Sequence, residues 1–282
     1  MSHALDPVRE PPQPSRPGSL LWELVGDWRL MMVMPGSMVM QVAHPMVGAG
    51  VGEHSVFRTD PWGRLLHSLE STLTLVYGGH AALAEGQRLQ EVHRAIRGVD
   101  DRGRRYWALH PQAYAWVHLI LFERLVTMSR LFGSPLSDPQ RRRLYAEMLE
   151  LGRVLQIRPA ALPPTEGEFW PNLARTTDEV LENHPTVHAF LDVLRESSIP
   201  PPRWPRRLER AWAPVGRRFG AVGHFLAVGT LPPRLRDLLD LRWTDAQERR
   251  LRKMGEGIAR TAPRIPARWR YLPQAARARG GR

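Results

Sequence analysis

The chain has 282 residues, 43% of them hydrophobic, which is enough to bury a sizeable core in one large domain or two small ones. Cysteine is absent, and this excludes thiolate-ligated haem, cysteine-ligated iron–sulfur clusters, cysteine-type structural zinc, disulfides and cysteine nucleophiles. The formal net charge of +12 is compatible with phosphate binding, but Lys253 is the only lysine, so arginine replaces lysine along the whole chain rather than in one patch. The charge by itself therefore does not indicate a nucleic-acid partner.

The first 18 residues are rich in proline, carry both signs of charge and lack the apolar segment of a signal peptide. We therefore expect residues 1–18 to be a disordered leader, because such a composition cannot bury a core. A helical domain is expected over residues 19–262, followed by a basic tail over residues 263–282. These features predict a cytoplasmic protein.

The segment 30–51 is almost long and apolar enough to span a membrane. Pro35-Gly36-Ser37 interrupts it early, and Gln41 and His44-Pro45 interrupt it later. We therefore expect a buried helix that begins after a Ser37 cap, and not a membrane span.

Apolar residues recur with the 3.6-residue period of helices, whereas the alternation typical of strands is scarce. The sequence therefore predicts an all-α fold. Asp60-Pro61 and Ser137-Asp138-Pro139 each place a capping side chain before a proline at a helix start. The expected helices cover residues 20–34, 38–48, 61–77, 81–97, 111–132, 138–155, 165–182, 187–195, 208–227, 233–239 and 245–262.

Two motifs are rejected on their spacing. In Gly48-Ala49-Gly50-Val51-Gly52 the third glycine comes one place early for a dinucleotide-binding turn, so we expect a flexible loop between helices. His184 and His188 have the spacing of a zinc site, but Pro185 puts His184 at a helix start and no glutamate follows it. We expect His184 to be a cap or a surface residue.

Polar residues on two neighbouring helices form the main candidate site. Helical spacing brings Arg64, His67 and Ser68 to one side of the helix 61–77. His93 lies on the next helix, and a lone helical histidine is ordinarily a hydrogen-bonded core or surface residue. One imidazole and one polar stripe among apolar helices are nevertheless what a buried haem needs.

A wider set of motifs surrounds these residues. They are Gln41-Val42-Ala43-His44-Pro45 with Gly50-Val51-Gly52-Glu53-His54-Ser55, Arg64-x-x-x-Ser68, Val92-His93-Arg94-x-Ile96-Arg97-Gly98, Tyr106-x-Ala108-x-His110-Pro111, Trp116-Val117-His118, Phe132-Gly133-x-Pro135-Leu136-Ser137 and Tyr145-Ala146-Glu147-Met148. This pattern resembles a known family, the haem-b oxygenases that include the latex-clearing rubber oxygenases and the MpaB-type enzymes. The resemblance covers roughly residues 26–157 and leaves the last third unmatched.

The resemblance implies haem b as cofactor and dioxygen as co-substrate. In that family the histidine of the V-H-x-x-x-x-G stretch is the proximal iron ligand, which implies this role for His93. The family's Arg-x-x-x-Thr pattern lines the other face of the haem, which implies that Arg64 and Ser68 lie there. Ser68 replaces the usual threonine, and His67 stands where a longer cationic side chain is common. His67 could itself ligate iron and give a six-coordinate resting state.

Two further residues complete the expected site. Glu53 is the candidate general base for proton abstraction from the substrate, with a solvated loop carboxylate as the alternative. Arg97 is the candidate partner of a haem propionate, with a plain surface arginine as the alternative.

We therefore expect a haem-dependent oxygenase, an oxidoreductase, that acts on a small hydrophobic substrate of isoprenoid or other unsaturated type. One alternative is a haem- or lipid-binding protein without turnover. The other is a basic helical nucleic-acid-binding module, which would not explain polar residues within apolar helices. The basic C-terminal third is compatible with peripheral contact with an anionic membrane, and the sequence does not specify the oligomeric state.

Overall fold

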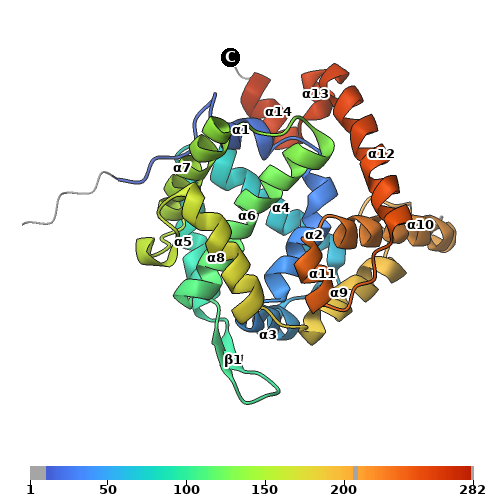
Figure 1. The fold of residues 1–282 in the computed structure, drawn as a ribbon, viewed down its shortest axis with the longest axis horizontal. Helices are drawn as coiled ribbons and strands as arrows, with labels where there is room; N and C mark the ends of the chain where they lie inside the picture. The colour runs from blue at the N-terminus through green and yellow to red at the C-terminus, as the bar shows by residue number, and fades with distance from the viewer. Residues whose placement is uncertain (1–10, 206–208, 281–282) are drawn as a thin grey trace, which may run out of the picture.

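Helices make up nearly all the regular structure in the computed structural model, which describes residues 11–205 and 209–280 (Figure 1). The all-α prediction is confirmed. Residues 1–10 of the expected leader lie outside the described residues. The helices are α1 (Leu20–Leu24), α2 (Leu30–Val42), α3 (Pro45–His54), α4 (Pro61–Tyr77), α5 (Ala81–Arg94), α6 (Pro111–Phe132), α7 (Asp138–Val154), α8 (Glu166–Glu179), α9 (Pro185–Glu196), α10 (Glu209–Gly229), α11 (Pro233–Leu238), α12 (Asp245–Thr261), α13 (Ala267–Arg270) and α14 (Pro273–Gly280).

The expected caps form where a short polar side chain precedes a helix. The Asp60 carboxylate accepts a 2.8 Å hydrogen bond from the Gly63 amide at the start of α4. Ser137 and Gln140 form a reciprocal capping box at the start of α7. These local contacts fix the starts of both helices where the sequence placed them.

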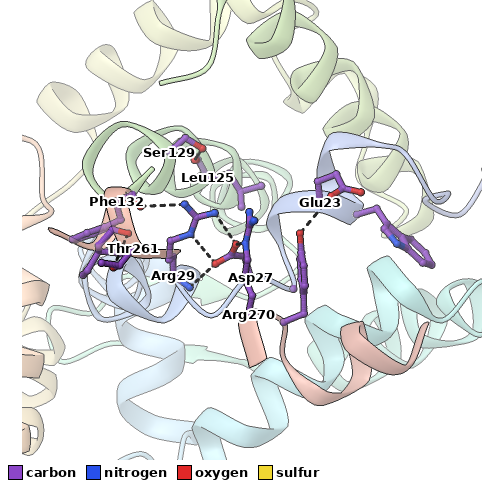
Figure 2. Close-up of polar contacts among 12 residues, drawn as sticks. Glu23, Asp27, Arg29, Leu125, Ser129, Phe132, Thr261 and Arg270 are labelled. Atoms are coloured by element: carbon purple, nitrogen blue, oxygen red, sulfur yellow. Dashed lines mark hydrogen bonds and ion pairs between the residues drawn. The ribbon is translucent and has the colours of Figure 1, made fainter. Parts of the chain in front are cut away.

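The predicted helix 20–34 is wrong, because the chain breaks between α1 and α2 at a buried ion-pair network (Figure 2). Asp27 is fully buried and lies 2.7 Å from Arg29 Nη2 and 2.8 Å from Arg270 Nε. Arg29 also donates to the Phe132 carbonyl at 3.1 Å. Burial raises the pKa of Asp27, but hydrogen bonds from Arg29 and Arg270 outweigh it and hold the pKa below its usual range. The ion-pair network at this break therefore connects the first helices to the C-terminal segment that carries Arg270.

The predicted break at Pro35-Gly36-Ser37 is also wrong. Helix α2 continues through Pro35, and Ser37 is buried within it, where its hydroxyl accepts a 3.1 Å hydrogen bond from Gln41. The chain turns instead at His44-Pro45, since a residue before proline disfavours the helical conformation. No single described helix is long and apolar enough to cross a bilayer, and α2 and α3 meet these criteria only as a pair bent by 105°.

The glycine-rich segment 48–52 lies inside α3 and is not the expected loop. A Cβ atom on Gly48 would lie 2.6 Å from His184 Nδ1, and one on Gly52 would lie 2.7 Å from Thr186 Oγ1. Small residues are therefore needed where α3 packs against α9. His184 is the expected cap of α9, accepting from the Thr186 amide at 3.2 Å, but it is buried and not on the surface.

The core lies on both sides of α6, which packs against α2, α7 and α12. One side holds a cluster in which the Phe122 and Phe169 rings meet edge to face at 4.7 Å, beside Tyr145. Burying each such ring contributes on the order of 2 kcal/mol. The second side surrounds Val39 and Ile120.

The predicted helix 81–97 ends early, because α5 stops at Arg94 and a hairpin follows. Strands β1 (Arg97–Val99) and β2 (Arg105–Trp107) pair antiparallel with Arg97 opposite Trp107, and the hairpin projects from the end of the molecule that is lowest in Figure 1. Glu182 anchors it through a 2.8 Å ion pair with Arg104.

Candidate functional site

The candidate site lies between α4 and α5, which pack side by side. They are joined by the tight turn 78–80, in which Gly79 has a left-handed backbone (φ +55°). So short a connection makes the two helices antiparallel neighbours, so the first turns of α4 face the last turn of α5. This arrangement brings Arg64 close enough to His93 for its charge to lower the pKa of that imidazole.

His93 lies in the last turn of α5 with its ring held from one side. Its Nδ1 donates a 2.7 Å hydrogen bond to the Leu89 carbonyl, which leaves the Nε2 lone pair free of the protein backbone. The Tyr114 ring meets the imidazole edge to face, with centroids 5.7 Å apart. Burial lowers the pKa of His93, and the charges of Arg64 and Arg88 lower it further, against the Leu89 hydrogen bond. His93 is therefore neutral near pH 7, the form that binds a metal.

Arg64 and Ser68 lie one turn apart and hold each other in place. The Arg64 guanidinium donates to the Ser68 hydroxyl, and that hydroxyl donates to the Arg64 carbonyl at 3.0 Å. Burial lowers the pKa of Arg64, and no carboxylate in the described part of the chain offsets this effect. The guanidinium is therefore a partly buried cation available to an anionic group.

Each of the two helices also exposes a large apolar side chain to solvent. Leu66 on α4 is 51% exposed, and Val92, next to His93 on α5, is 47% exposed. Leu66 is two residues from both Arg64 and Ser68, so it lies on a different face of α4 from that pair.

The other expected site residues lie outside this pair of helices or at its margin. His67 is exposed on α4, where it acts electrostatically on Glu85. Glu53, at the end of α3, is exposed and accepts a hydrogen bond from the Tyr106 hydroxyl of the hairpin. Arg97 is exposed in β1. The structure thus brings Arg64, Ser68 and His93 together.

Tyr114, which contacts His93, and the histidines His44 and His110 have no assigned role in the sequence interpretation. The Tyr114 hydroxyl and the Nδ1 atoms of His44 and His110 are buried without a hydrogen bond to any described residue. Burial raises the pKa of Tyr114 to about 12. Burial and the nearby His110 lower the pKa of His44 to about 4. The signal in the sequence was a histidine directly before a proline at each of two helix starts.

The fold and these contacts define a helical protein whose candidate site combines a neutral imidazole with a guanidinium that no carboxylate of the described residues pairs with. The chain belongs to the family described as the catalytic domain of the ER-bound oxygenase mpaB/B' and rubber oxygenase, which matches residues 22–260. The suspected family is thereby confirmed, and the match extends well beyond the region that carried the resemblance. The protein therefore carries an oxygenase-family catalytic domain.

Two relatives are similar to the chain over most of their length. They are uncharacterized proteins from Mycobacterium bovis and Mycobacterium tuberculosis, each 26% identical over 252 residues, which cover 86% of this chain and 93% of the relative. No solved structure shows a significant match to the chain.

Proposed function

We propose that the protein is a haem-dependent oxygenase that uses dioxygen to oxidise a small hydrophobic molecule of unsaturated type, and that His93 is the residue that would hold the iron. The observation that carries this proposal is the hydrogen bond from His93 Nδ1 to the Leu89 carbonyl, 2.7 Å long. A metal-binding histidine ordinarily donates its other ring N–H in this way, which fixes the tautomer and makes the ligand more basic.

The residues present fit a haem. His93 supplies one neutral imidazole, and Arg64 supplies a partly buried cation without a carboxylate partner, as a propionate or another negatively charged oxygen requires. Val92, next to His93 in α5, is 47% exposed and adds an apolar side chain to the same end of the helix pair. The absence of cysteine is consistent with an imidazole ligand.

When bound, the haem supplies the redox chemistry that activates dioxygen. The protein's own residues then have distinct tasks. Leu89 and Tyr114 orient the His93 ring, and Ser68 holds the Arg64 guanidinium in place. Arg64 stabilises negative charge where it develops in the site. In this proposal Glu53 takes a proton from the substrate onto its carboxylate, and the Tyr106 hydroxyl orients that carboxylate.

The test is the absorption spectrum and pyridine haemochrome content of protein expressed with a haem precursor, beside His93→Ala. His80→Ala is the matched control, because His80 is exposed at the other end of α5 and caps it without a side-chain hydrogen bond. We expect about one haem per chain in the wild type and the control, and little in His93→Ala. Oxygen uptake with squalene or an unsaturated fatty acid then tests turnover. A folded wild-type protein without haem would contradict the proposal, and haem without oxygen uptake would indicate a binding protein.

A further inference from the structure

A second candidate binding site lies away from α4 and α5, among α9, α10 and α12. A cavity of about 380 Å³ opens there, between the last turn of α9, the C-terminal half of α10 and the first turns of α12. Figure 1 shows α10 and α12 on the side of the molecule opposite α5. A volume of this size is within the range of small-molecule sites.

One wall of the cavity is aromatic. Phe225 of α10 and Trp243, just before α12, lie with ring centroids 5.1 Å apart and planes tilted by 41°. Val228 and Ala221 extend this apolar wall along α10. The Trp243 indole donates to Glu248 at 2.8 Å, which fixes the orientation of the ring. The wall is therefore suited to a flat, apolar body.

The rim of the cavity is positively charged and incompletely neutralised. Arg195, Arg242 and Arg250 all line it. Arg250 lies over the Phe225 ring at 5.2 Å, and neither Arg250 nor Arg242 forms an ion pair with a carboxylate of the described chain. Arg195 lies 3.9 Å from Asp192, a weak contact between two exposed side chains. At least two guanidinium groups are thus free to bind an anion.

His224 adds a polar group at the same place without adding charge. Arg195 Nη2 donates to His224 Nε2 at 3.0 Å, so this ring nitrogen is an acceptor. Burial lowers the pKa of His224, and Arg195 lowers it further, against a small opposing effect of Asp192. The neutral imidazole holds Arg195 at the rim, where its remaining N–H groups can donate to a ligand.

We propose that this cavity binds a small organic anion, a planar apolar body with a carboxylate or phosphate head, with the body on Phe225 and Trp243 and the head on Arg242 and Arg250. Guanidinium groups recognise both head groups with paired hydrogen bonds. The site is independent of the haem proposal, since none of its residues belongs to α4 or α5.

The experiment is titration calorimetry of the full chain with 1-naphthyl phosphate, 1-naphthoate and the uncharged 1-naphthol. We expect at least one of the two anions to bind, and the tighter of them identifies the preferred head group. The uncharged 1-naphthol should bind at least about tenfold more weakly than that anion. Arg242→Gln with Arg250→Gln should weaken anion binding by about tenfold or more. Binding of neither anion, or equal binding of 1-naphthol, would overturn the proposal.

A matched control separates this site from general attraction to a basic protein. Arg249→Gln with Arg252→Gln removes the same charge from α12, at exposed residues that do not line the cavity. We expect this control to keep wild-type affinity. An equal loss of affinity in both double variants would contradict a built site, and thermal unfolding followed by circular dichroism verifies that each variant is folded.

Discussion

The Nδ1 atom of His93 lies 2.7 Å from the carbonyl oxygen of Leu89, one turn earlier in α5. This contact uses one ring nitrogen and leaves the Nε2 lone pair free, and the charge of Arg64 lowers the pKa of the imidazole. The Leu89 carbonyl therefore fixes the tautomer and the orientation of the His93 ring. His93 is half-buried, whereas His67, the other histidine within α4 and α5, is exposed.

Ser68 acts through Arg64, and this role can be tested by changing its hydroxyl. Ser68→Ala removes the group that the Arg64 guanidinium contacts, so the cation loses its fixed position. We expect oxygen uptake to fall by about tenfold while haem content is retained, since a hydrogen bond to a charged group contributes on the order of 1.5–3 kcal/mol. Ser68→Thr keeps the hydroxyl and should restore activity. Equal activity in the alanine and threonine variants would refute a positioning role.

The Asp27 network should dominate the stability of the N-terminal region. Asp27→Asn leaves Arg29 and Arg270 partly buried without their carboxylate, and we expect a loss of about 3–5 kcal/mol in the free energy of unfolding. Asp138→Asn is the matched control, because its ion pair with Arg141 is largely exposed and should contribute less than about 1 kcal/mol. Urea unfolding measures both. Similar losses in the two variants would show that burial does not determine the strength of these pairs.

Acid should destabilise the protein through His118. This side chain is buried, its Nε2 lies 2.9 Å from the Met148 carbonyl, and burial lowers its pKa to about 4. In the unfolded chain this histidine has its ordinary pKa of about 6.5. Between pH 6.5 and pH 4 the unfolded chain therefore binds more protons than the folded protein, and the free energy of unfolding falls as the pH falls. We expect about 2 kcal/mol less stability at pH 5 than at pH 7 from this residue.

The measurement for this prediction is the difference in unfolding free energy between pH 7 and pH 5 in wild type and His118→Gln. The variant should lose part of the pH dependence, whereas His80→Gln, at an exposed site, should keep all of it. The same acid sensitivity in His118→Gln and wild type would exclude His118 as its source.

The space around Gly48 in α3 and Gly257 in α12 predicts opposite effects on stability when each is replaced by alanine. Gly48→Ala places a Cβ 2.4 Å from the Val42 carbonyl and 2.6 Å from His184, and should destabilise by about 1–3 kcal/mol. Gly257→Ala in α12 meets nothing within 4 Å and should stabilise by up to about 1 kcal/mol. Melting temperatures of the two variants decide the matter, and a stable Gly48→Ala protein would show that α3 can shift away from α9.

Local signals explain which helices the sequence predicted well. Helices α4 and α6 begin and end at the predicted residues, because each has a proline in its first turn and is followed by a glycine, Gly78 or Gly133. The Asp60 side chain also caps α4. The break between α1 and α2 could not be predicted in this way. It depends on Arg270, which is 243 residues from Asp27 in the sequence.

In the candidate site too, contacts within one helix were predictable from the sequence and contacts between helices were not. The spacing of Arg64 and Ser68 on one helix predicted their contact, because it is local. The edge-to-face contact of Tyr114 with His93 joins α6 to α5, and no periodicity in either helix indicates it. The hairpin that carries Arg97 and Tyr106 was missed because strands of three residues are too short to show an alternating pattern. The structure brings three of the expected residues together, but the roles assigned to all of them stay predictions: His93, Arg64, Ser68, Glu53, His67 and Arg97.

The most direct test of the central claim is chemical rescue of His93→Gly, compared with the wild type by absorption spectroscopy. If His93 is the axial ligand, the variant should lose or shift the haem absorption band, and added imidazole should restore the wild-type spectrum by occupying the space left by the side chain. A His93→Gly protein with a wild-type haem spectrum in the absence of imidazole would contradict the account.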